Sequence, residues 1–91
     1  MKLTGKCLEE FLKQFCGELP VNETMLNALI IEFFDSVGIY ILPLHRDVVN
    51  KLNFSCDIYK TDEPINFFNE WVQTRTEATN AAITKANELY N

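Results

Sequence analysis

A dense apolar stretch, Met25–Ile41, most constrains what this chain can fold into. Its first part repeats apolar residues at three- and four-residue steps, as a buried helix does, whereas its end alternates as a strand does. The period changes across residues 35–38, where Asp, Ser and Gly are typical of turns. The stretch therefore predicts a helix over 23–34 that leads into a strand over 37–42. A strand over 29–34 is the alternative, because β-branched and aromatic residues are dense there.

Helices are also predicted at both ends of the chain. Apolar residues recur at helical steps over 5–16, with Thr4 as the expected N-cap. Asn22 is the expected N-cap of the helix over 23–34, whose broad apolar arc includes Val21, Met25, Leu29 and Phe33. The run Thr74-Arg75-Thr76-Glu77 has the pattern of a capping box and predicts a helix over 75–90.

The region between the helices predicts strands. Apolar and polar residues alternate most clearly over 52–59, with Asn53, Ser55, Asp57 and Tyr59 on the wet face. Pro43 is expected either to end the strand that precedes it or to place that strand at a sheet edge. Residues 44–51 form a connector to which the sequence assigns neither helix nor strand, and Ile65, Phe67 and Trp71 predict a returning strand after a turn.

These elements predict one α+β domain over residues 1–91. Their order is α-α-β-β-β-α, and the simplest architecture is a three-stranded antiparallel meander with helices packed on one face. The middle of this order resembles that of double-stranded RNA-binding domains. Those domains need basic residues where the last helix begins, and here Arg75 is offset by Glu77. With eight scattered Lys and Arg and a net charge of −5, the chain is not expected to bind nucleic acid.

The sequence predicts a chain in the cytoplasm. Glu9 and Glu10 interrupt any apolar leader segment, and Glu32 and Asp35 interrupt the best candidate for a membrane span. An odd count of three Cys without a Cys-x-x-Cys pair is typical of reduced thiols.

No residue pattern predicts catalysis, a cofactor or a metal. His45 could act as a general base beside Cys56 or Asp47, yet the surrounding residues lack the signature of a nucleophile site. A zinc site from Cys7, Cys16, Cys56 and His45 would lack finger spacing. We therefore expect no enzyme, no cofactor and no metal.

Three stretches of the chain carry a resemblance. They are Leu3–Phe11, Glu32–Ile41, and Thr74–Ala78 followed by Ala82–Asn91. Together they cover about 40% of the chain and are similar to a group of small proteins without assigned activity that phages and prophages of gut Bacteroidetes encode. The resemblance implies a phage or prophage context and transfers no catalytic residue.

The expected function is a non-enzymatic interaction protein that binds, and by binding inhibits, a host protein such as a defence-system component. The expected contact residues on the wet sheet face and the acidic turn are Tyr40, Asp57, Tyr59, Asp62, Glu63 and Trp71. The alternative is a nucleotide or small-molecule binding module at the interface of a homo-oligomer, with Arg46, Lys51 or Arg75 facing phosphates.

Overall fold

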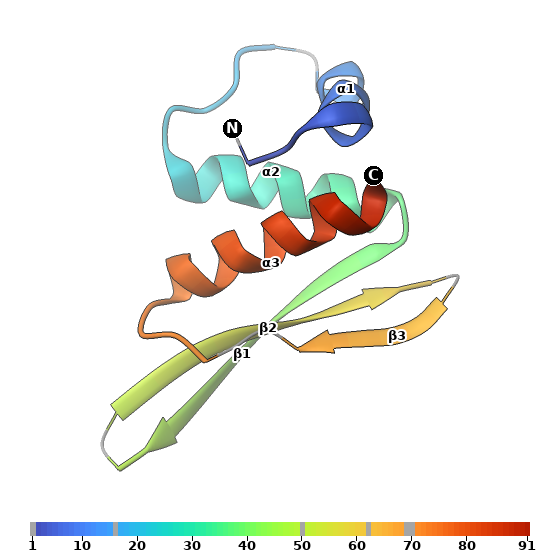
Figure 1. Cartoon of the computed structure of the whole chain (residues 1–91). Helices are drawn as coiled ribbons and strands as arrows, with labels where there is room; N and C mark the ends of the chain where they lie inside the picture. Colours follow the sequence, from blue (N-terminus) through green and yellow to red (C-terminus); the bar gives the residue numbers. More distant parts are fainter. Residues whose placement is uncertain (1, 16, 50, 62, 69–70) are drawn as a thin grey trace.

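The computed structural model describes residues 2–15, 17–49, 51–61, 63–68 and 71–91, and the side chains among them other than those of residues 48 and 63–68. The elements follow in the order α1 (Gly5–Gln14), α2 (Glu23–Ser36), β1 (Ile39–Val48), β2 (Lys51–Lys60), β3 (Glu63–Phe68) and α3 (Arg75–Tyr90) (Figure 1).

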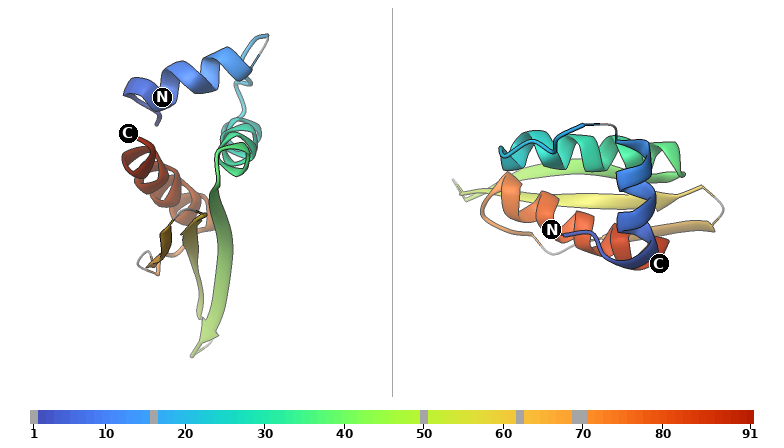
Figure 2. Two further views of the ribbon diagram at one scale, coloured as in Figure 1. Left: turned by 90° about the vertical axis from the view of Figure 1, so that its right-hand side faces the viewer. Right: turned by 90° about the horizontal axis from the view of Figure 1, so that it is seen from above.

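The elements form three layers. Helices α2 and α3 lie side by side on one face of the β1–β2 ladder, and α1 lies across these two helices on the side away from the sheet (Figures 1 and 2). Both ends of the chain lie near α1, where the end of α3 meets the start of α1. None of the described helices is long and apolar enough to cross a membrane.

The predicted architecture, a three-stranded meander with the helices on one face, is wrong. The sheet that α2 and α3 cover is the two-stranded antiparallel ladder of β1 and β2, which pairs from Ile39 opposite Lys60 to Val48 opposite Lys51. Segment β3 is the third strand by pairing, but it meets β2 only over Asp57–Lys60, with a bulge there. Helix α1 packs on the other helices, because its buried face fits the groove between them.

Strand β1 continues five residues beyond Pro43, through most of the predicted connector. Phe54 exchanges both backbone hydrogen bonds with Val72, at 2.8 Å each, on the side of β2 away from β1. By alternation, the backbone of Cys56, the partner of Pro43, also faces away from β1. The nitrogen of Pro43 therefore faces the free edge of β1, where no ladder hydrogen bond is lost.

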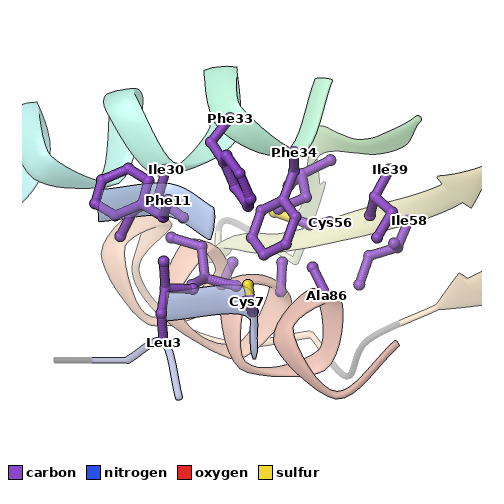
Figure 3. Packing of buried hydrophobic residues seen from close by; sticks show 14 residues of the cluster. Leu3, Cys7, Phe11, Ile30, Phe33, Phe34, Ile39, Cys56, Ile58 and Ala86 are labelled. Atoms are coloured by element: carbon purple, nitrogen blue, oxygen red, sulfur yellow. The ribbon is translucent and has the colours of Figure 1, made fainter. Parts of the chain in front are cut away.

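The hydrophobic core lies between the helical layers and the sheet. Phe34 of α2 shares the core with Ile39 and Ile58 of the ladder, whereas Phe33 meets Phe11 of α1, with ring centroids 5.7 Å apart (Figure 3). Its α3 side consists of Ala78, Ala82, Ile83 and Ala86, which are all at most 1% exposed. Small alanine side chains bring α3 close to the sheet.

The predicted apolar arc of α2 is wrong at its start. Val21, which precedes α2, and Met25, in its first turn, are exposed. Asn27 is buried instead: its Oδ1 accepts from Lys2 Nζ at 3.2 Å, and its Nδ2 donates to Asn80 Oδ1 at 3.1 Å. Residues Asp35 and Ser36, predicted as a turn, extend the helix, and the Ser36 hydroxyl donates to the Phe33 carbonyl at 2.6 Å.

The N-terminus of α1 is capped by the end of α3. The Thr4 hydroxyl, predicted as the cap, makes no capping bond. Asn91 Oδ1 accepts from the Cys7 N–H at 2.9 Å, and Asn91 Nδ2 donates to the Thr4 carbonyl at 3.0 Å. Asn87 adds two bonds to Thr4, since its Oδ1 accepts from the backbone N–H at 2.9 Å and its Nδ2 donates to the hydroxyl at 3.0 Å. At the other end of the molecule, Thr74 caps α3 as predicted, accepting from the Glu77 N–H at 3.1 Å.

Replacing Asn91 with Ala is expected to lower the free energy of unfolding by about 1 kcal/mol, because α1 loses its cap. Hydrogen exchange should accelerate most at the Cys7 amide, whose hydrogen bond disappears. Glu88→Ala, in the same last turn but on the exposed face, is the control. Equal exchange at Cys7 in both variants would contradict the capping role.

Gly38→Ala is expected to cost about 1–3 kcal/mol, because Gly38 has φ of +82° and an added Cβ would meet the Thr61 hydroxyl. That hydroxyl donates to the Gly38 carbonyl at 2.8 Å and would have to move. Gly17→Ala is the control, since its φ is also positive but no side chain lies closer than 4.0 Å to its added Cβ. Urea unfolding should show the larger loss for Gly38→Ala, and the reverse order would show that Thr61 does not matter.

Candidate functional site

The face of the sheet turned away from the helices carries the exposed aromatic side chains. Successive residues of a strand point to opposite faces. Ile39, Ile41 and Ile58 are buried under the helices, so Tyr40 and Tyr59 point outward. The register places these two tyrosines directly opposite each other, and they are 39% and 38% exposed.

Leu42 and Asp57 extend this pair along the ladder. Leu42, 46% exposed, lies opposite Asp57, one step beyond the tyrosines on the same face. We define Tyr40, Leu42, Asp57 and Tyr59 as the outer patch. It combines two amphipathic rings and one apolar side chain with one carboxylate, a composition typical of protein interfaces.

Asp57 is the member of the outer patch that has an acceptor atom without a hydrogen bond. Its Oδ1 atom is buried and has no hydrogen-bond partner among the described residues. A buried acceptor without a donor costs free energy that a hydrogen bond would recover. Asp57 therefore contributes a carboxylate to the outer patch, one oxygen of which the described residues leave unpaired.

Trp71 is adjacent to Val72, whose backbone pairs with Phe54, three residues along β2 from Asp57. The guanidinium carbon of Arg46 is 4.3 Å from the centroid of the half-buried Trp71 ring, a cation–π contact. Arg46 is paired with Asn53 and therefore lies on the same outward face as the outer patch, beyond Leu42 along β1.

The structure thus groups three of the six predicted contact residues, Tyr40, Asp57 and Tyr59. Trp71 lies farther along β2, beside Val72, which pairs with Phe54. Asp62 lies outside the described residues, as does the side chain of Glu63.

The cations of the alternative hypothesis do not converge within one chain. Arg46 shares the outward face, where it contacts Trp71. Arg75, at the start of α3, lies 5.4 Å from the centroid of the Phe54 ring, which by alternation is on the helix side. Lys51 is at the end of the hairpin, as the first residue of β2. A phosphate held by all three would need a second copy of the chain.

The thiols of Cys7 and Cys56 are placed for packing. Burial raises the pKa of the Cys7 thiol to about 11. Burial also raises the pKa of Cys56, and the nearby Asp57 charge adds to this effect. A protonated thiol is a poor nucleophile, so neither residue is activated. His45 is exposed opposite Phe54. No metal-binding group of three His, Cys, Asp or Glu occurs among the described residues, and Cys16 lies outside them.

A pocket of about 300 Å³ between α1 and α2 was not anticipated from the sequence. Phe11 and Gln14 of α1, with Phe15 directly after it, face Leu29, Glu32, Phe33 and Ser36 of α2 across it. Both sets follow helical spacing, which by itself predicts a helix face and no pocket. Only the docking of α1 on α2 shows that polar side chains share this face.

Comparison of the chain with protein-family models, with curated proteins and with solved structures found no match.

The raised pKa of Cys7 predicts a pH dependence of stability. The folded state holds this proton more tightly than the unfolded state, whose thiol has its usual pKa of 9.0. The resulting stability is complete below pH 9 and is lost as the pH rises toward 11, by up to about 1.4 kcal/mol per pH unit. Urea unfolding from pH 8 to 11 should give a flatter profile for Cys7→Ala than for the native chain. Parallel profiles would show that Cys7 is not the group responsible.

Proposed function

We propose that the chain is a non-enzymatic interaction protein that binds a host protein through the outer patch. The observation that carries this proposal is the exposed Tyr40–Tyr59 pair on a sheet face that no described helix covers. Tyrosine offers a large contact area with few rotatable bonds, and it is enriched among the residues that dominate binding energy.

Asp57 supplies the charged group of the proposed interface. An Arg or Lys side chain of the partner would pair with the half-buried Asp57 carboxylate, with Leu42 and the tyrosines excluding water around it. The net charge of −5 also favours encounter with a basic surface.

The resemblance to phage- and prophage-encoded proteins supports a bacterial host as the source of this partner. A small binder from such a context would act in the host cytoplasm by covering a surface that a defence protein needs. The partner surface expected from the outer patch is apolar, with at least one exposed Arg or Lys.

The test is capture of a host protein from lysate by the tagged chain and by two double variants. Tyr40→Ala with Tyr59→Ala removes the aromatic pair and is expected to reduce capture at least tenfold. Leu12→Ala with Met25→Ala removes comparable exposed apolar area elsewhere, at side chains 47% and 61% exposed, and should leave capture unchanged. Quantitative proteomics at near-physiological salt measures the difference.

Two outcomes would overturn the proposal. One is the absence of any host protein at stoichiometric amounts, and the other is equal loss of capture in both double variants. A nucleotide that co-elutes without protein would instead support the small-molecule alternative, and light scattering would then show whether two copies form the site.

A further inference from the structure

The pocket between α1 and α2 lies on the opposite side of the helical layer from the outer patch and is independent of it (Figure 2). Its lining comes from one face of each helix, at three- and four-residue steps. Its volume of about 300 Å³ is at the small end of the range for ligand pockets. A ligand group of a few non-hydrogen atoms is therefore the expected occupant.

Aromatic rings form one wall of this pocket. Phe11 stacks against the half-buried Phe15, with ring centroids 6.2 Å apart, and meets Phe33 edge-on at 5.7 Å. Phe33 also contacts Phe34 and Tyr90, at 5.5 and 5.8 Å, so the wall continues into the rigid core. The faces of aromatic rings carry negative potential and attract cations.

The polar side of the pocket offers acceptors. The Ser36 hydroxyl lies 3.3 Å from Gln14 Oε1 and 2.6 Å from the Phe33 carbonyl, so its proton is already shared between two acceptors. Glu32 is exposed and forms no ion pair among the described residues. No Lys or Arg lines the pocket.

We propose that this pocket binds a cationic group on a short apolar stem, of the alkylammonium or alkylguanidinium class. Glu32 neutralises the charge, Gln14 Oε1 accepts one of its hydrogen bonds, and the Phe15 and Leu29 side chains cover the stem. The same chemistry occurs in free amines and in the Lys and Arg side chains of proteins. Neutral or anionic groups would leave the Glu32 carboxylate without a counter-charge.

The test is a titration of the isotope-labelled chain, followed by amide chemical shifts, with n-butylammonium and n-butylguanidinium at constant ionic strength. Shifts are expected to concentrate in α1 and α2 around the pocket residues. The neutral control, n-butanol, should bind at least about fivefold more weakly, because it lacks the charge. Blocked peptides that contain one Lys or one Arg distinguish the two sources, since tighter binding than the free amines identifies a protein side chain.

Matched variants assign the site. Glu32→Gln keeps the shape of the side chain and should weaken binding of the cation at least about fivefold. Glu9→Gln, an exposed carboxylate on α1 outside the pocket lining, removes the same net charge and should not. Equal affinity for butanol, or equal loss in both variants, would overturn the proposal. The Tyr40→Ala, Tyr59→Ala chain should retain cation binding, so failure of one proposed site is distinguishable from failure of the other.

Discussion

The amide contacts between the end of α3 and the start of α1 are the constraint on which the outer helical layer depends. Helix α1 contacts α2 and α3, and the buried side chains that attach it are few: Leu3, Cys7 and Phe11. Asn87 and Asn91 form hydrogen bonds with backbone groups of Thr4 and Cys7. These groups are partly buried and would otherwise lack hydrogen-bond partners. Geometry at this joint therefore sets how α1 sits on α2, and with it the width of the pocket between Phe15 and Glu32.

On the other side of the molecule, the register of β1 with β2 determines which side chains form the outer patch. A shift of one residue would move Tyr40 under the helices and Ile41 into solvent. Buried Ile39, Ile41 and Ile58 oppose such a shift, so the outer patch is a consequence of core packing. Pro43 adds a second effect, because it removes an N–H from the middle of the free edge of β1 and makes that edge a poorer template for another strand. Contact through the face of the sheet is thereby favoured over contact through its edge.

Sequence patterns predicted the parts of this structure that depend on neighbours in the chain. The helix over 75–90 and its Thr74 cap follow local rules, as does the outward direction of Asp57 and Tyr59 on β2. The cap of α1 by Asn91 could not be predicted, because its partners are more than 80 residues away in the sequence. The extent of β1 was missed because a proline is tolerated at an edge, and the edge is defined only by the assembled sheet. The pocket likewise depends on how the helices dock in the folded chain. In the sequence alone, Glu32 is only an interruption of an apolar run.

The two proposed sites share an excess of acceptors over donors. At the outer patch the unmatched group is one buried oxygen of Asp57 among tyrosines and a leucine. At the pocket, a carboxylate and a carboxamide oxygen stand beside phenylalanine rings, and the nearest hydroxyl proton is already engaged. An apolar wall with an unpaired acceptor is best completed by a cationic donor on an aliphatic stem, because the stem covers the wall while the charge meets the acceptor. A partner surface rich in Arg and Lys would satisfy both sites, and the negative charge of the whole chain would draw such a surface toward it.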